Sequence, residues 1–288
     1  MTTIPVATTA PADGDRDLAR DIERVLDVLA GRRISVLTGA GVSTDSGIPD
    51  YRGTGAPVRS PMTFQTFIAD SRARQRYWAG SHLGWQRFAT AAPNAGHRAL
   101  ADLESRGIVN GLVTQNVDGL HLRAGSRRVV DLHGALDRVR CLTCGQSFDR
   151  GSIADRMAAA NPWLAEPGAL ELNPDGDVSV EHVDEMVVPD CTVCGGVLKP
   201  EVVFFGEFVP TEKYTEARAL VRSSDAFLIA GSSLVVNSGI RLLDQAVKKR
   251  LPVVIVNRGQ TKGDARATLK IESGTSEILT ALRDRLAG

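Results

Sequence analysis

The sequence predicts an α/β protein built on a parallel β-sheet, with a small cysteine-bearing module inserted into it. Short apolar, β-branched runs alternate with helical patterns over most of the chain, an order typical of parallel sheets covered by helices. Glycine-rich or polar segments directly follow several of these runs, as they do in nucleotide-binding folds. Four cysteines form two Cys-x-x-Cys pairs within one polar stretch. Together these observations give the fold class.

The composition of the 288-residue chain agrees with that class. Hydrophobic residues make up 43% and aromatic residues only 5%, which predicts an aliphatic core large enough for a domain with a smaller module. The 34 Lys and Arg residues balance the 34 Asp and Glu residues, so no basic field favours nucleic acid or an anionic membrane. No apolar run reaches the ~18 residues that a membrane span needs, so no membrane association is expected.

The N-terminal residues 1–16 are expected to form a disordered tail. Residues 1–20 contain three Asp and two Arg and lack an apolar core. They therefore resemble neither a secretory signal nor an Arg-rich transit peptide, and a cytoplasmic location is expected. From 17 to 29, apolar residues recur at helical spacing and predict an amphipathic helix.

The remaining elements are predicted from the same periodicities. Strands are expected at 34–38, 108–114, 129–132, 202–205, 225–230, 252–257 and 267–271. Helices are expected over much of 63–105, with a break at Pro93-Asn94, and at 211–222, 239–249 and 276–286. Residues 17–135 and 200–288 would form one Rossmann-like nucleotide-binding domain, interrupted by a module at 136–199.

A glycine-rich segment, residues 39–43, follows the first strand directly. Its backbone N–H groups could hold a pyrophosphate, because little side chain stands in the way. The segment departs from the G-x-G-x-x-G pattern, since Thr44 occupies the third glycine position. A tight turn with no ligand is therefore an alternative interpretation. Residues 47–53 are polar and rich in glycine, a composition that predicts a loop folding over a ligand.

Polar side chains follow further strands. Residues 114–121 offer amide and acid groups at a strand end, although Asn116 or Asp118 could instead cap a helix. His133 follows the third strand and could act as a general base near neutral pH, whereas no chemistry is assigned to the other histidines. Residues 231–234 and 257–259 follow two later strands. Five such segments are expected to converge at one edge of the sheet.

The cysteine pairs Cys141-x-x-Cys144 and Cys191-x-x-Cys194 favour one tetrahedral zinc ion. The 46 residues between the pairs exceed the usual zinc-ribbon spacing, so the intervening chain must loop out and return. A redox dithiol is the alternative, but it needs only one pair. Four protein ligands would close the site, so the zinc is expected to be structural.

In this order, GAGVSTDSGIPDYRG, TQNVDGLH, HG, CxxC, CxxC, FFGE, GSSLVV and VNRG resemble the sirtuins, the NAD-dependent protein deacylases. The resemblance covers about residues 22–286. The segments Arg74-Gln-Arg-Tyr-Trp-Ala and Gly84-Trp-Gln-Arg-Phe88 are similar to the class II branch that includes the mitochondrial lipoamidase-type sirtuin.

The resemblance implies that NAD is consumed as a co-substrate and that acyl-lysine proteins or peptides are the partners. His133 and Asn116 would be the catalytic residues. The implied NAD-binding residues are Gly39, Ala40, Gly41, Ser43, Asp50, Tyr51, Arg52, Gln115, Asn116, Asp118, Gly231, Ser232, Ser233, Asn257, Arg258, Gly259 and Thr275. The implied peptide-binding residues, on two segments that would pair with an extended substrate, are Phe205, Gly206, Glu207, Leu234 and Val235.

The resemblance also implies a mechanism. The acyl oxygen would attack the nicotinamide ribose and expel nicotinamide, after which His133 would deprotonate a ribose hydroxyl. Sirtuins that prefer succinyl or malonyl groups carry Tyr-x-x-Arg, whereas Tyr77 here is followed by Gly80, which predicts a preference for uncharged acyl groups. Three alternatives stay open: a protein mono-ADP-ribosyltransferase, a non-catalytic NAD-sensing zinc protein and, less favoured because the G-x-G-x-x-G pattern is broken, an NAD oxidoreductase.

Overall fold

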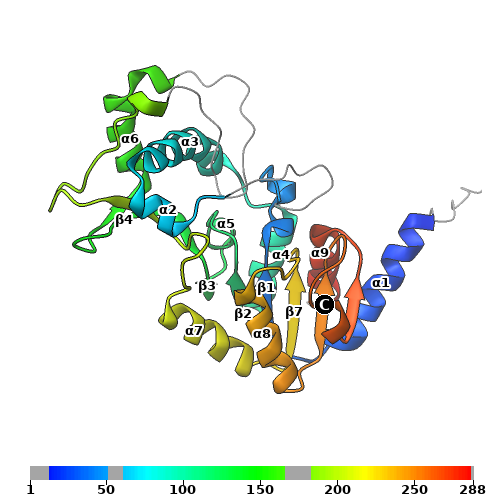
Figure 1. Cartoon of the computed structure of the whole chain (residues 1–288). Helices are drawn as coiled ribbons and strands as arrows, with labels where there is room; N and C mark the ends of the chain where they lie inside the picture. The colour runs from blue at the N-terminus through cyan, green and yellow to red at the C-terminus, as the bar shows by residue number, and fades with distance from the viewer. Residues whose placement is uncertain (1–12, 51–60, 166–182, 287–288) are drawn as a thin grey trace, which may run out of the picture.

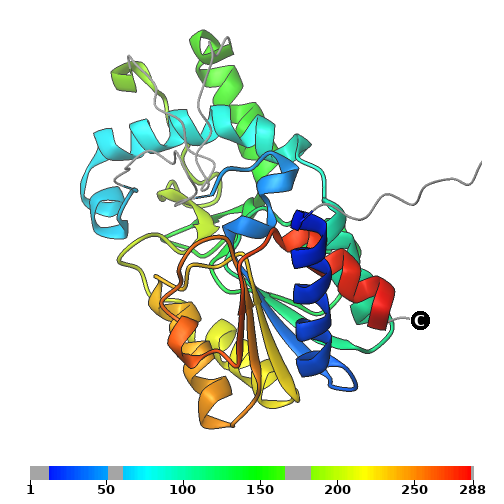
Figure 2. The same cartoon turned by 90° about the vertical axis from the view of Figure 1, so that its right-hand side faces the viewer.

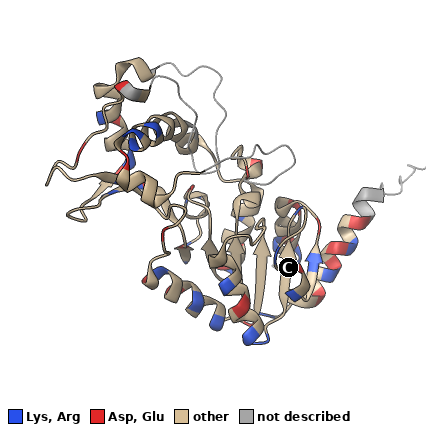
Figure 3. Cartoon of the chain, viewed as in Figure 1, with Lys and Arg blue, Asp and Glu red and all other residues tan. Residues whose placement is uncertain are grey.

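The structure is a computed structural model that describes residues 13–50, 61–165 and 183–286, and the statements below concern those residues. They form a larger part, built on a parallel sheet, and a smaller lobe that carries the cysteines (Figure 1). In the described residues, no helix is both long and apolar enough to cross a membrane. Lys and Arg are interspersed with Asp and Glu over both parts, most visibly along the first helix (Figure 3).

The larger part contains a six-stranded sheet of order β3-β2-β1-β7-β8-β9, in which every pairing is parallel. Every residue of β1 and β7 is buried, as expected for central strands covered on both faces. The predicted parallel α/β sheet is therefore confirmed. Its strands are β1 (Ile34–Thr38), β2 (Val109–Thr114), β3 (Val129–Asp131), β7 (Ala226–Ala230), β8 (Val253–Val256) and β9 (Leu269–Ile271).

Helices cover both faces of this sheet. One face is packed by α1 (Asp13–Leu29), α4 (Ala95–Ser105) and α9 (Thr275–Leu286), and α1 lies beside α9 (Figure 2). The other face is packed by α7 (Thr211–Arg222) and α8 (Asn237–Lys248). The strand order reverses between β1 and β7, and parallel sheets bind ligands in the crevice at such a switch point.

The smaller lobe contains an antiparallel sheet of order β5-β4-β6. Its strands are β4 (Gly134–Cys141), β5 (Ser147–Asp149) and β6 (Leu198–Val202), and its helices include α6 (Arg150–Ala160). The strand that the sequence predicts at 202–205 thus lies earlier and belongs to this second sheet. An apolar run of four residues does not show which strand it will pair with. Here the chain returns beside β4, and the strand therefore joins the antiparallel sheet of the smaller lobe.

Two helices that precede the cysteines in the chain share the core of the smaller lobe. They are α2 (Phe64–Ala69) and α3 (Ser71–Thr90). The indole Nε1 of Trp78 in α3 donates to the Leu198 carbonyl of β6 at 3.3 Å, and Met157 of α6 packs in the same cluster. The side chain of Arg150 is fully buried with its guanidinium over the Trp78 ring. The lobe is therefore assembled from chain segments on both sides of β2.

Several short elements complete the described structure. α1 begins at Asp13, so four residues of the expected N-terminal tail are helical. The remaining elements are α5 (Leu120–Arg123), η1 (Ala40–Val42), η2 (Thr44–Ser46), η3 (Pro162–Ala165), η4 (Val183–Glu185) and η5 (Asp264–Arg266).

Candidate active site

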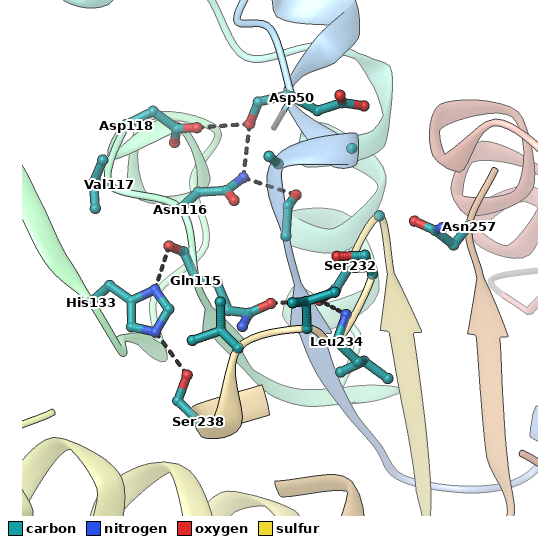
Figure 4. A pocket seen from close by; sticks show the side chains of 18 of the residues that line it. Asp50, Gln115, Asn116, Val117, Asp118, His133, Ser232, Leu234, Ser238 and Asn257 are labelled. Carbon is teal, nitrogen blue, oxygen red and sulfur yellow. Dashed lines mark hydrogen bonds between the residues drawn. The ribbon is translucent and has the colours of Figure 1, made fainter. Parts of the chain in front are cut away.

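A cavity of about 1300 Å³ lies at the carboxyl edge of the parallel sheet (Figure 4). Each of the five loop segments predicted to converge contributes to its wall. The sequence-predicted NAD and peptide residues that line it are Gly39, Ala40, Gly41, Ser43, Asp50, Gln115, Asn116, Asp118, His133, Phe205, Gly206, Glu207, Gly231, Ser232, Ser233, Leu234, Val235, Asn257, Arg258, Gly259 and Thr275. Tyr51 and Arg52 lie outside the described residues.

The glycine turn after β1 packs directly against the loop after β7. The N–H of Gly41 donates to the Gly231 carbonyl at 2.9 Å, and a Cβ added to Gly41 would lie 2.8 Å from the Gly231 Cα. A Cβ on Gly39 would lie 2.7 Å from the Gly231 oxygen. Gly231 also adopts the left-handed conformation, with φ 64°. Glycine is therefore required here by the close approach of the two loops, and this approach fixes the floor of the cavity.

A polar network joins the turn to the loop after β2. The Asn116 amide donates to the Gly39 carbonyl at 3.1 Å and to Ser43 Oγ at 3.0 Å, and Ser43 Oγ donates to Asp118 at 2.7 Å. The other oxygen of Asp118 accepts from Leu120 N at 2.9 Å, so Asp118 also holds the start of α5. Burial raises the pKa of Asp118, although these hydrogen bonds oppose the shift. The network aligns two loops along the cavity wall.

Two buried histidines lie behind this network. The rings of His97 and His121 have centroids 4.7 Å apart, and His97 Nε2 lies 3.5 Å from Ser43 Oγ. His121 Nε2 lies 2.8 Å from Thr38 Oγ1 at the end of β1. Burial lowers the pKa of His97 to about 4 and that of His121 well below its ordinary value. Sequence reasoning assigned these residues no chemistry, because neither directly follows a predicted strand.

His133 is held at both ring nitrogens. Its Nδ1 lies 3.0 Å from the Gln115 carbonyl oxygen, and its Nε2 lies 2.8 Å from Ser238 Oγ. Burial lowers the pKa of His133, while the contact with Gln115 acts in the opposite direction. The imidazole is therefore neutral near pH 7 and can accept a proton. Ser238, at the start of α8, was not among the site residues predicted from the sequence.

The loop after β7 adopts a strained conformation. Leu234 has φ 56°, and its side chain is buried in the core beside α8. Its backbone N–H reaches Ser232 Oγ at 3.3 Å, and that hydroxyl donates to the Gln115 side chain at 2.6 Å. Non-glycine residues with positive φ are uncommon and often occur at ligand sites. Because the side chain points into the core, Leu234 can offer only its backbone to the cavity.

The opposite wall is formed by the segment after β6. Phe205 is exposed, and its carbonyl accepts from Phe64 N at 2.9 Å at the start of α2. Glu207 accepts from Phe204 N at 2.9 Å and pairs with the buried Lys199 at 3.0 Å. Lys199 Nζ also lies 4.6 Å from the centroid of the Phe204 ring. An ion pair between a buried lysine and a partly exposed glutamate thus shapes the segment that faces the loop of Leu234.

The four cysteines form a second site in the smaller lobe. All four Sγ atoms lie within 4.8 Å of one another, with Cys141–Cys194 at 3.5 Å and Cys144–Cys191 at 3.7 Å. Four thiolates on one zinc ion lie about 3.8 Å apart, given Zn–S bonds of ~2.3 Å. The two knuckles have matching turns, in which Gly145 N donates to Cys141 O and Gly195 N to Cys191 O. This geometry fits one tetrahedral structural zinc.

The comparisons with known proteins agree with this arrangement. A family model described as the Sir2 family matches residues 39–238. The chain belongs to the Sir2 family. NAD-dependent protein deacetylase 1 of Mycobacterium avium (strain 104) is 51% identical over 264 residues, which cover 90% of this chain and 94% of that protein. A second relative with the same name, from Streptomyces coelicolor, is 50% identical over 270 residues, covering 92% of this chain and 90% of its own.

Solved structures of sirtuins share the fold of this chain. A complex of a Sir2 protein with a p53 peptide and NAD+ superposes with a TM-score of 0.74 at 29% identity, covering 92% of this chain and 98% of that one. A Sir2 protein bound to an acetylated peptide superposes with a TM-score of 0.72 at 28% identity, covering 92% and 98%. The predictions of a sirtuin, of NAD as its co-substrate and of a four-cysteine zinc site are confirmed. The class II branch stays a prediction.

Proposed function

We propose that this sirtuin removes acyl groups from protein lysine side chains, consuming NAD and producing nicotinamide, O-acyl-ADP-ribose and free lysine. The observation that carries the proposal is the shared cavity, in which His133, the glycine turn and the Phe205 segment line one space. The relatives named above are NAD-dependent protein deacetylases, which supports the same reaction class. Acetyl-lysine is therefore the first substrate to test.

The chain's residues would divide the work along the cavity. The backbone N–H groups after β1 and β7 would bind the NAD phosphates, because glycine leaves them accessible. Gln115, Asn116 and Asp118 would hold the nicotinamide ribose and carboxamide. Phe205–Glu207 and the backbone of residues 234–235 would pair with the peptide on either side of the acyl-lysine. Asn116 would thus act beside the reacting ribose.

His133 would supply the base. The acyl oxygen attacks the ribose anomeric carbon as the bond to nicotinamide breaks, and this step needs no proton transfer from the histidine. A ribose hydroxyl then transfers its proton to His133 Nε2 and attacks the acyl carbon. The neutral imidazole suits this role, since burial lowers its pKa.

We also propose a preference for uncharged acyl groups. Tyr77 lines the cavity and packs edge-on against Phe67, with ring centroids 5.6 Å apart, and also contacts Phe204 at 4.9 Å. Three residues further along the chain, position 80 is a glycine, which brings no cation to a substrate carboxylate. The same helix carries the class II-like motif at residues 74–79, and we propose that the chain belongs to that branch.

A nicotinamide-release assay over a peptide panel tests both proposals. The expected result is release that depends on an acyl-lysine peptide, with formation of O-acyl-ADP-ribose and faster turnover of acetyl-lysine than of succinyl-lysine. If NAD that is labelled in its ADP-ribose part transfers the label to protein instead, the chain is the alternative enzyme, an ADP-ribosyltransferase. Faster removal of succinyl than of acetyl groups would refute the acyl preference alone.

A further inference from the structure

The side chain of Ser238 faces the catalytic candidate from a different part of the chain. It lies at the start of α8, is buried, and lines the cavity with its Oγ 2.8 Å from His133 Nε2 (Figure 4). Its hydroxyl is the one side-chain partner that the described residues give to this nitrogen. The contact therefore involves the ring atom that would accept the proton in the proposed reaction.

The hydrogen-bond partners determine which nitrogen carries the ring hydrogen. A backbone carbonyl can only accept, so the 3.0 Å contact between His133 Nδ1 and the Gln115 oxygen requires a hydrogen on Nδ1. Neutral imidazole has one N–H, which leaves a lone pair on Nε2. Ser238 must then donate its hydroxyl hydrogen to Nε2 in the resting site. The two contacts hold the ring from opposite ends.

We propose that Ser238 is a positioning residue that fixes the imidazole of His133 and accepts a hydrogen bond from Nε2–H once the base is protonated. The inference rests on the proposed role of His133. A hydroxyl can do both because it has one hydrogen and two lone pairs. As the ribose hydroxyl approaches, the Ser238 hydrogen turns away and frees the single lone pair of Nε2. The ribose proton then forms the new Nε2–H bond, and the Ser238 oxygen accepts from it.

The charged side chains around His133 have other partners, so the Ser238 hydroxyl is the group that hydrogen-bonds to Nε2. On the loop after β2, Asp118 is bonded to Ser43 and Leu120. On the segment after β6, Glu207 is paired with Lys199. On α8, Arg241 stacks 4.1 Å from the ring centroid of Tyr214, which lies on α7. None of these charged side chains is hydrogen-bonded to the imidazole in the described structure.

Charged groups close to His133 in the chain and the dipole of α8 act on the imidazole in opposite directions. Asp131, on β3, has its pKa raised to about 6 by burial, while Lys213 of α7 and Arg138 of β4 act in the opposite direction. The start of α8 carries the partial positive charge of a helix N-terminus, which disfavours an imidazolium. A direct acceptor at Nε2 offsets that effect. Charge-assisted hydrogen bonds are roughly twice as strong as neutral ones, so the Ser238 contact stabilises the protonated ring more than the neutral ring.

The test compares Ser238→Ala with Ser238→Thr, which keeps the hydroxyl. We expect Ser238→Ala to lower single-turnover acyl transfer about tenfold, the effect of losing one hydrogen bond to a charged group. Exchange of labelled nicotinamide into NAD should stay near the wild-type rate, since that step precedes the base. The acid limb of the acyl-transfer rate should move to lower pH, because the pKa of His133 falls. Ser238→Thr should recover most of the rate and the acid limb.

Controls separate this inference from the proposed function. Ser223→Ala removes a hydroxyl at the opposite end of the sheet, where Ser223 ends α7, and should leave both reactions unchanged. Thermal melting of each variant checks the fold. If the wild-type protein shows no peptide-dependent turnover, or if the His133→Ala variant is active, the proposed function and this inference are both wrong. If His133→Ala loses acyl transfer while Ser238→Ala keeps the wild-type rate and pH profile, the Ser238 inference alone is wrong.

Discussion

At the residue scale, Gly231 shows how close packing limits the site. A Cβ at this position would lie 2.5 Å from Val42 N and would also be strained at φ 64°. Gly31 has a similar φ of 72° but no atom within 4 Å of its added Cβ. We expect Gly31→Ala to cost about 1 kcal/mol of unfolding free energy from strain alone.

Gly231→Ala should cost more and should also weaken NAD binding, because the two loops must separate. Urea unfolding and NAD titration of both variants provide the measurement. Equal stability losses, with NAD affinity unchanged, would show that the loop contact is unimportant.

His97 should make stability depend on pH. Its folded-state pKa of about 4 lies below the ordinary 6.5, so the unfolded chain binds more protons between these values. Stability is then fully present above pH 6.5 and falls as the pH drops through it, by about 2 kcal/mol at pH 5 for this residue. Asp131, whose pKa is raised to about 6, contributes in the opposite sense below that pH.

The variant His97→Gln isolates the histidine contribution. Unfolding free energies measured in urea at pH 7.5 and pH 5 should differ by about 2 kcal/mol less in the variant than in wild type. Protonation of Asp131 is common to both proteins and cancels in this difference. An identical loss in the two proteins would contradict the prediction.

Residue-level chemistry was predictable where a residue directly follows a strand. The placement of His133, Asn116 and the glycines around one cavity followed from this rule, because parallel strands bring their carboxyl ends to one edge. Their roles stay predictions. Ser238 follows Leu234, whose left-handed turn directs the chain back towards His133. His97 reaches the site through α4. The order of residues in the sequence does not indicate that these distant segments lie close together in the folded protein.

At the element scale, the Lys199–Glu207 pair connects β6 to the segment that faces the cavity. Replacing Lys199 by Met leaves the Glu207 carboxylate without its cation. We expect a loss of about 2 kcal/mol in stability, less than for a fully buried pair because Glu207 is partly exposed. The KM for acyl-peptide should rise more than the KM for NAD.

Two variants provide controls for that prediction. Lys199→Arg keeps the charge and should lose less stability. Lys249→Met removes a cation at the far end of α8, whose Nζ donates to the Ser224 carbonyl at 2.7 Å, and should leave both KM values unchanged. A Lys199→Met protein with wild-type stability and wild-type peptide KM would show that the pair does not shape the segment.

Element types were predicted better than element partners. Strands β1, β7 and β8 fall close to the expected residues, because buried parallel strands are continuous apolar runs. The helical pattern of α3 was visible too, but amphipathicity indicates only that one face is buried. Its partner, the core around Met157 and Leu198, could not be inferred from that pattern.

At the scale of the whole molecule, the zinc site should control the stability of the smaller lobe. Cys144 is exposed, so Cys144→Ser removes a ligand with little loss of packing. We expect metal analysis to find the zinc lost and the thermal midpoint lowered by several degrees, since metal binding is coupled to folding. A chelator should act similarly on wild type, and added zinc should restore it. An unchanged midpoint after zinc loss would exclude a structural role.

His133 also marks one of the places where the chain passes from the sheet-bearing part to the smaller lobe. It immediately precedes β4, and its carbonyl accepts from Val203 N at 2.8 Å where the chain returns from β6. A tilt of the smaller lobe about these adjacent crossings would displace atoms in proportion to their distance from the pivot. The rim of the cleft would then open for substrates and products while the imidazole, beside the pivot, kept its place on the sheet.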